Sequence, residues 1–151
     1  MGVDLDAFLR KHRRIAIDTS IFIYQLEANA RYLPLSERVF SWLEGTGHKA
    51  VTSTITMTEL LVQPYRTLDQ KRVDEIASLL STYPALDWIA PDLEIADSAA
   101  RIRAEFGLKI PDAIQLATAM SVAATGIVTN DEAFKRVREV DALMLDDVLS
   151  T

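Results

Sequence analysis

Four acidic side chains, widely separated along this chain, each stand beside an apolar segment where they could do chemistry. They are Asp18, Glu59, Asp112 and Asp131. Carboxylate oxygens suit hard divalent cations such as Mg²⁺ or Mn²⁺, which keep several waters and share oxygens with substrate phosphates. A cation in such a place activates water and offsets the charge that develops on a phosphate. If the four acids converge, their types predict metal-assisted hydrolysis of a phosphodiester bond.

Other catalytic classes are excluded by composition. The 151 residues include no cysteine and two histidines, His12 and His48. The lack of cysteine excludes disulfides, thiolate metal sites and cysteine nucleophiles. Two histidines are too few for a multi-histidine metal centre, and neither a His-Glu-x-x-His nor a Gly-x-Ser-x-Gly pattern occurs. Any catalysis must therefore depend on carboxylates.

The elements that must position these acids can be located from the apolar pattern. Short β-rich runs alternate with segments whose apolar residues recur three or four positions apart, which is typical of parallel strands joined by helical crossovers. Asp69 and Asp92 stand where helix N-caps are expected, and Gly45 where a helix should stop. The pattern predicts an α/β fold. The predicted strands cover residues 15–17, 50–53, 86–89, 126–129 and 143–145.

This layout places all four acids at the same edge of the sheet. Asp18 directly follows the first predicted strand, and Asp131 closely follows the strand at 126–129. Glu59 lies only ~7 Å along the helix that leaves the second strand, at 1.5 Å per residue. Asp112 opens the helix that leads back to the strand at 126–129. Because ligands of such folds bind beyond the carboxyl ends of the strands, this edge is the predicted site.

Each acid taken singly also has a simpler interpretation. Asp18 and Asp112 could each stabilise the start of a helix. The segment from Thr129 to Glu132 fits a capping box, and Glu59 could be a solvated helix residue. Four such charges about 5 Å apart, however, repel one another by on the order of 20 kcal/mol at an effective dielectric near 20. That exceeds the stability of a small domain. Convergence of the four acids therefore predicts a bound cation.

Four sequence motifs resemble those of a known family. IAIDTS at residues 15–20, TMTELL at 56–61, PDAIQLA at 111–117 and VTNDEAF at 128–134 are similar, in order and spacing, to the acidic motifs of the PIN domain family. That family comprises metal-dependent nucleases and includes the VapC toxins of bacterial toxin–antitoxin pairs. The ordered quartet, which extends over almost the whole chain, is more specific than any one motif.

The resemblance implies a fold, a site and partners. It implies a three-layer α/β/α sandwich with a central parallel sheet of about five strands. The four acids would hold one or two Mg²⁺ or Mn²⁺ ions, with Thr129 and Ser20 assisting through hydrogen bonds. The implied protein is a metal-dependent endoribonuclease that cuts single-stranded RNA, the toxin of a type II toxin–antitoxin system. A homodimer and a cognate antitoxin that blocks the site are also implied.

Basic residues near the acids are candidates for binding substrate phosphates. Lys109 precedes Asp112, and Lys135 with Arg136 follows Asp131, so we predict substrate contacts at Lys109 and Lys135. The basic run at residues 10–14 enters the first strand and so belongs to the opposite edge, where we interpret it as solvated surface.

Two other protein classes do not fit this sequence, and a third alternative to a nuclease stays open. A haloacid-dehalogenase-like phosphatase needs a second Asp two positions after Asp18, where this chain has Ser20. A response-regulator receiver needs a pair of acids after its first strand, which this sequence lacks. A PIN-fold binding or regulatory module with little nuclease activity stays open, although such a module has no reason to keep all four acids.

Length and charge predict one domain covering residues 1–151. The chain has 16 basic and 22 acidic residues, a net charge of −6 and an apolar fraction of 49%, enough to bury a core. Residues 1–14 form an extension before the first strand, with a short helix near residues 4–9 that we expect to pack on the surface. With neither an apolar leader nor a membrane-spanning run, we expect a cytoplasmic protein without a membrane partner.

Overall fold

A parallel β-sheet forms the centre of the chain in this computed structural model, which describes residues 3–149. Its five strands lie in the order β3-β2-β1-β4-β5, and every neighbouring pair is parallel. The α/β fold class and the strand positions predicted from the sequence are confirmed, except for the last strand. The sequence predicts that strand at residues 143–145, but it begins at Asp141 and ends at Met144, because Leu145 begins a helix. The strands are β1 (Arg14–Ile17), β2 (Lys49–Ser53), β3 (Leu86–Ile89), β4 (Gly126–Thr129) and β5 (Asp141–Met144).

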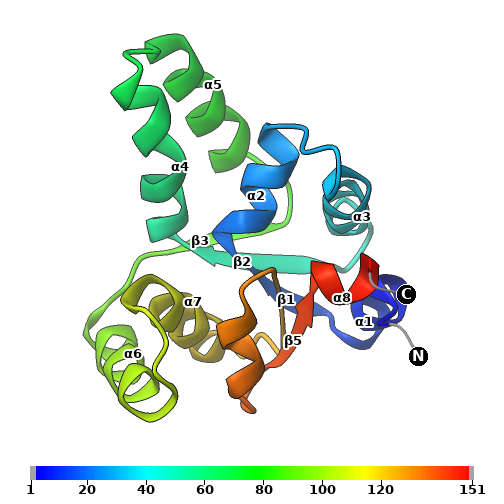
Figure 1. The fold of residues 1–151 in the computed structure, drawn as a ribbon, viewed down its shortest axis with the longest axis vertical. Coiled ribbons are helices and arrows are strands. Elements are labelled where there is room, and N and C mark those ends of the chain that lie inside the picture. Colours follow the sequence, from blue (N-terminus) through cyan, green and yellow to red (C-terminus); the bar gives the residue numbers. More distant parts are fainter. Residues whose placement is uncertain (1–2, 150–151) are drawn as a thin grey trace.

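Helices cover both faces of this sheet, so the fold has the three α/β/α layers expected from the resemblance (Figure 1). Asp69 and Asp92 cap α5 and α6 as predicted, accepting hydrogen bonds from the backbone N–H groups of Arg72 at 3.0 Å and Ile95 at 2.8 Å. Among residues 3–149, no helix is long and apolar enough to cross a membrane. The helices are α1 (Leu5–Lys11), α2 (Thr19–Leu26), α3 (Leu33–Leu43), α4 (Thr54–Arg66), α5 (Gln70–Ser81), α6 (Leu93–Phe106), α7 (Ile110–Ser121), the 3-10 helix η1 (Glu132–Arg136) and α8 (Leu145–Leu149).

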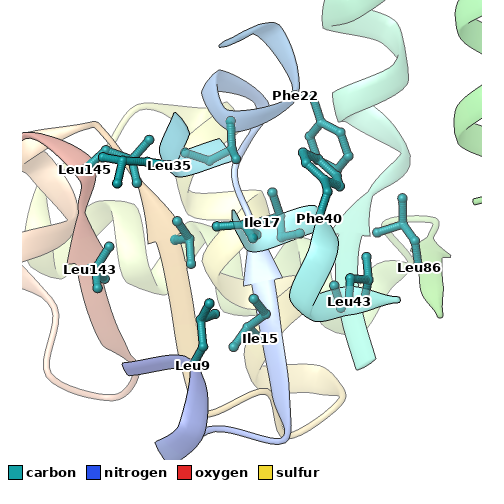
Figure 2. Packing of buried hydrophobic residues seen from close by; sticks show 14 of the residues in the cluster. Leu9, Ile15, Ile17, Phe22, Leu35, Phe40, Leu43, Leu86, Leu143 and Leu145 are labelled. Atoms are coloured by element: carbon teal, nitrogen blue, oxygen red, sulfur yellow. The ribbon is translucent and has the colours of Figure 1, made fainter. Parts of the chain in front are cut away.

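Alternating side chains of the strands divide the core into two clusters. Ile15 and Ile17 of β1 face one layer, where they pack with buried residues of α1 to α5 and of α8 (Figure 2). Ala16, between them, faces the opposite layer and packs with α6, α7 and η1. Because successive strand residues point to opposite faces, burial on both faces holds β1 in a fixed register. Residue 18, which follows, is thereby fixed at the carboxyl edge.

The N-terminal helix α1 is part of the core, which corrects the expectation that it packs on the surface. Leu5, Phe8 and Leu9 are buried against the cluster that contains Ile15. His12, which follows α1, is also buried; its ring nitrogens lie 2.6 Å from Thr125 Oγ1 and 2.9 Å from Asp141 Oδ2. The basic run at residues 10–14 is therefore not uniformly solvated.

The close packing of α1 on β4 predicts a steric effect at Gly126. A Cβ atom added there would lie 2.7 Å from Phe8 Cζ and 2.9 Å from His12 Cδ2. We expect Gly126→Ala to lower the free energy of unfolding in urea by about 1–3 kcal/mol, the usual effect of overpacking. The double variant Phe8→Leu/Gly126→Ala should lose less than the sum of the single losses, because leucine leaves room for the new methyl group. Unchanged stability of Gly126→Ala would contradict the described packing of α1.

Candidate active site

Asp18 stands at the carboxyl end of the central strand β1 and begins α2. Its Oδ1 atom accepts a hydrogen bond from the backbone N–H of Thr19 at 2.9 Å, and its Oδ2 atom accepts one from the Thr129 hydroxyl at 2.8 Å. The residue is only 6% exposed. The predicted capping role and the predicted position at the sheet edge are thus combined in one buried carboxylate.

Thr129 and Asp131 come from the end of the neighbouring strand β4. Thr129 is buried; besides donating to Asp18, its hydroxyl accepts a hydrogen bond from the backbone N–H of Asp131 at 3.1 Å. Asp131 caps η1 through the N–H of Ala133 at 2.9 Å. The cap of this turn is therefore Asp131, not Thr129, so the alternative capping box of Thr129 with Glu132 is not formed. Thr129 connects two of the four acids instead.

Asp112 lies in the first turn of α7, after Pro111, and is partly buried. The helix that carries it packs under the sheet and contacts both β2 and β1. A carboxylate in a first turn is favoured by the helix dipole. The preceding Lys109 is the N-cap residue of this helix and is exposed.

Glu59 reaches the same edge from the other layer, on α4. Its Oε1 atom accepts a hydrogen bond from the Thr19 hydroxyl at 2.8 Å. An ionised carboxylate only accepts hydrogen bonds, so the single Thr19 proton points at Glu59. The hydroxyl oxygen of Thr56 lies 3.1 Å from that of Thr19 and 2.7 Å from that of Thr52. The single proton of Thr56 can serve only one of the two, because Thr52 donates its own to the Ile17 carbonyl. The sequence placed Glu59 at this edge, but it did not reveal that neighbours hold it there.

A buried hydrogen-bond chain links Glu59 to the helix that carries Asp112. Thr56 accepts a hydrogen bond from the side-chain amide of Gln115 on α7. The other end of that amide, Gln115 Oε1, accepts from the backbone N–H of Ser53 at 3.1 Å. Thr56 and Gln115 are buried, with 0% and 1% exposure. The chain therefore holds α2, α4 and α7 together directly behind the acids.

Electrostatic interactions connect all four acids. Burial raises the pKa of Asp18 to about 6, against the hydrogen bonds from Thr129 and Thr19, and the charges of Glu59 and Asp131 raise it further. Burial, the side chain of Asp131 and the charge of Asp18 raise the pKa of Asp112 to about 7, with smaller contributions from the charges of Asp131 and Glu59. Perturbed carboxyls of this kind concentrate at functional sites. The structure thus brings the predicted quartet together.

The donor set fits a hard divalent cation held partly by other oxygens. Like-charged carboxyls that raise one another's pKa gain from a positive charge between them. Within residues 3–149, no three Asp, Glu, His or Cys side chains lie close enough together to hold a metal ion by themselves. Mg²⁺ is usually held by one or two carboxylates, with waters and substrate phosphates as its other ligands. An incomplete cage of oxygen donors is compatible with that mode of binding.

Three further predicted residues differ in their placement. The Ser20 hydroxyl is buried but has no hydrogen-bond partner within the described part of the chain, so the expected bond to an acid is not formed. Lys109 is exposed near Asp112. Lys135 makes ion pairs of 3.2 Å with both Glu132 and Asp147. Two acids thus already compensate the Lys135 charge, which weakens the case for a phosphate contact there.

The residues that sequence reasoning missed are uncharged. Thr19, Thr56 and Gln115 lie within the recognised motifs but were given no role. The available signal is their spacing: Thr56 precedes Glu59 by three positions and Gln115 follows Asp112 by three, so each shares a helix face with an acid. A buried polar side chain on such a face needs a hydrogen-bond partner.

A hollow of about 240 Å³ adjoins Glu59 between α2, α4 and α5. Apolar side chains of Ile23, Leu60 and Ile76 line it, together with polar groups that include Arg72. The Arg72 guanidinium also donates a hydrogen bond to the backbone carbonyl of Leu26 at 3.1 Å. A hollow of mixed apolar and charged character thus lies directly beside one of the four acids.

Comparison with known proteins identifies similar sequences and folds. Residues 15–140 match the PIN domain family. No curated protein matches the chain. VapBC-1 of nontypeable Haemophilus influenzae is 22% identical with a TM-score of 0.67, covering 88% of this chain and 98% of that one. A toxin–antitoxin complex from Klebsiella pneumoniae is 21% identical with a TM-score of 0.64, covering 87% and 97%. Mycobacterium tuberculosis VapC20, a toxin that cleaves the sarcin–ricin loop, is 17% identical with a TM-score of 0.65, covering 84% and 98%.

Proposed function

The chain belongs to the PIN domain family, and from this premise we propose that it is a Mg²⁺- or Mn²⁺-dependent endoribonuclease that cuts single-stranded RNA. We further propose that residues 1–151 act as one domain, as the cytoplasmic toxin of a type II toxin–antitoxin pair. The observation that supports the proposal is that burial, together with the charges of neighbouring acids of this set, raises the pKa of Asp18 and Asp112. We propose that Asp18, Glu59, Asp112 and Asp131 act together at this sheet edge.

The residues of the site would have different roles in the proposed reaction. The four acids would hold the divalent ion, which when bound supplies positive charge to the scissile phosphate and activates water. Thr129 orients the Asp18 carboxylate, and Thr19 orients that of Glu59. Lys109, which is exposed and precedes Asp112 by three residues, would contact a phosphate of the substrate. Ser20 stays a candidate for a hydrogen bond to substrate or water.

An RNA cleavage assay tests this function. We expect the protein to cut single-stranded RNA in the presence of Mn²⁺ and to lose this activity when the ion is chelated. Products with 5′-phosphate and 3′-hydroxyl ends are expected from attack by water. Absence of cleavage across a varied set of RNA sequences would favour the alternative, a PIN-fold binding module. The same protein preparation should therefore also be tested for Mn²⁺ binding.

We also propose two protein partners, a second copy of the chain and a cognate antitoxin. Solved relatives of similar fold include toxin–antitoxin complexes from Klebsiella pneumoniae and Haemophilus influenzae. The hollow beside Glu59, lined by both apolar and charged side chains, is a candidate site for an inhibitory segment, because an occupant there would lie against the catalytic edge. Mass measurement of the free protein in solution tests the dimer. Co-expression with a neighbouring small DNA-binding open reading frame tests the antitoxin.

The buried chain behind Glu59 predicts an effect at Thr56. Thr56→Val removes the hydroxyl that joins Thr19 to Gln115, leaving a buried amide donor unpaired at a cost of about 1–3 kcal/mol. The Mn²⁺ concentration for half-maximal cleavage should rise about tenfold, because residues that orient ligands influence metal affinity. The matched control is Thr118→Val. It removes a buried hydroxyl on α7 that donates a hydrogen bond to the Ile114 carbonyl. Equal Mn²⁺ requirements in both variants would show that Thr56 only stabilises the fold.

A further inference from the structure

The amino-terminal edge of the sheet, opposite the four acids, carries two adjoining hollows. The larger, of about 500 Å³, is lined by residues that include Arg10, Arg13, Trp42 and His48. The smaller, of about 290 Å³, shares Arg13 with it and adds Arg14 and Lys49. We call the two together the basal groove. Its lining contains no acidic residue, although 22 of the 151 residues are acidic.

The positive charges of the basal groove are largely available to a ligand. Arg10 and Arg13 are exposed, and within residues 3–149 neither makes an ion pair. Lys49 makes only a loose pair of 3.5 Å with Asp87, and about half of each of these side chains is exposed. Such surface pairs contribute little energy and exchange readily. Arg14 donates a hydrogen bond to the Val122 carbonyl. An anionic ligand would therefore meet Arg10, Arg13 and Lys49 without strong competing partners.

A fixed aromatic wall borders these cations. The ring of Trp42 packs against the hydrophobic core and is stacked with that of His48, with centroids 4.3 Å apart and planes inclined by 10°. A hydrogen bond between His48 Nδ1 and the Trp42 carbonyl holds the pair in place. Arginines beside flat aromatic groups are typical of surfaces that bind single-stranded nucleic acid, where phosphates meet cations and bases stack on rings. This combination favours RNA over an acidic peptide, which needs no stacking surface.

The charge distribution of the chain suggests that RNA needs a second, basic contact surface. The chain has a net charge of −6, and its catalytic edge carries four acids. An RNA strand therefore experiences no long-range electrostatic attraction to that edge. The five residues of β2 extend about 16 Å at 3.3 Å per residue, which sets the separation of the two edges. A single strand several nucleotides long, running along the side of the domain, can span that distance.

We propose that the basal groove binds the phosphate backbone of single-stranded RNA beyond the segment that is cut. This inference rests on the proposed function, because it assigns a second contact to the same substrate. The occupant is identified by its chemistry, an anionic backbone with stacking bases. No particular base sequence is implied.

Binding and cleavage measurements together test the inference. The variant is Arg10→Glu/Arg13→Glu, and the control is Lys71→Glu/Arg101→Glu, which changes the charge equally at exposed positions of α5 and α6. Binding of labelled single-stranded RNA is measured by fluorescence anisotropy with chelator present, so that it is independent of catalysis. We expect the variant to bind about tenfold more weakly than the control. Its salt dependence, the slope of log K against log salt, should be shallower by about 1.4, because each lost contact to a single strand contributes about 0.7.

Substrate length separates the groove from the catalytic edge. With Mn²⁺, the variant should show a raised KM and an unchanged kcat for long RNA, and normal kinetics for an oligonucleotide too short to span the edges. Equal RNA binding by variant and control, or an RNA affinity too weak to measure in the unaltered protein, would overturn the inference. So would a variant that loses only binding to a polyglutamate peptide, because the groove would then be a protein-binding surface. Loss of cleavage with groove-dependent RNA binding intact would contradict the proposed function alone.

Discussion

Asp18→Asn is expected to lower Mn²⁺-dependent cleavage of single-stranded RNA at least about 100-fold. Substitutions that only reorient a metal ligand already cost about 10–100-fold, and this change removes the charge of the most buried of the four acids. The fold should survive, because the asparagine oxygen can still accept from the Thr19 N–H while its amide faces the Thr129 hydroxyl, which can accept. Initial rates at saturating RNA and varied Mn²⁺ concentration measure the effect.

The matched control for Asp18→Asn is Asp97→Asn, on the exposed face of α6. It removes the same charge from the protein but not from the catalytic edge, so its cleavage rate should stay within about twofold of the unaltered protein. Retention of substantial activity by Asp18→Asn, with normal unfolding behaviour, would exclude Asp18 from the proposed role. Equal loss in both variants would trace the effect to net charge.

Asp112→Asn is expected to stabilise the protein when divalent cations are chelated. The pKa of Asp112 is raised from 3.8 to about 7, so folding opposes its ionisation. A pKa shift of this size nominally corresponds to about 4 kcal/mol, but the side chain is half-exposed and solvent screens part of the effect. We therefore expect the free energy of unfolding at pH 8 to increase by about 1–2 kcal/mol in the variant.

The stability gained by Asp112→Asn should depend on pH. Well below pH 3.8 the Asp112 carboxyl is protonated in both folded and unfolded chains, so the variant should gain nothing there. As the pH rises from about 4 to about 7, the unfolded chain ionises first, and the unaltered protein loses stability relative to the variant. Urea unfolding at several pH values measures the difference, with Asp97→Asn as control. A variant less stable than the unaltered protein at pH 8 would mean that the Asp112 charge is already compensated.

The sheet could be predicted because its strands are short apolar runs bounded by clear helical patterns. Ile15 to Ile17 and Gly126 to Thr129 are buried on both faces, so they read as uninterrupted β-rich segments. The packing of α1 could not be predicted in the same way. Its Leu5 and Leu9 form too short a pattern to distinguish a surface helix from a core helix. Contacts with α3 and the close approach of Phe8 to Gly126 of β4 hold α1 in place, and both involve residues distant in the sequence.

The acidic quartet was predictable because each acid follows a strand or opens a helix, and a parallel sheet brings those positions to one edge. The supporting polar residues were not predictable to the same degree. Threonine and glutamine inside a helix pattern predict neither burial nor a functional role. Only the fold reveals that Thr56 and Gln115 are buried and hydrogen-bonded to each other. For Lys135 the sequence predicts a substrate contact that the structure does not favour. Its ion pair with Asp147 depends on how β5 and α8 return to the sheet, which the sequence does not reveal.

The central claim is that these four carboxylates tolerate one another because a divalent cation neutralises them. The most direct test is a Mn²⁺ titration of thermal unfolding, without RNA, in the unaltered protein and in Asp112→Asn at pH 8. We expect the Tm of the unaltered protein to rise saturably, by about 5 °C or more at a hundredfold excess over Kd. The Tm of Asp112→Asn should begin higher and respond weakly. An equal Mn²⁺ response in both proteins, or none in the unaltered protein, would contradict the claim.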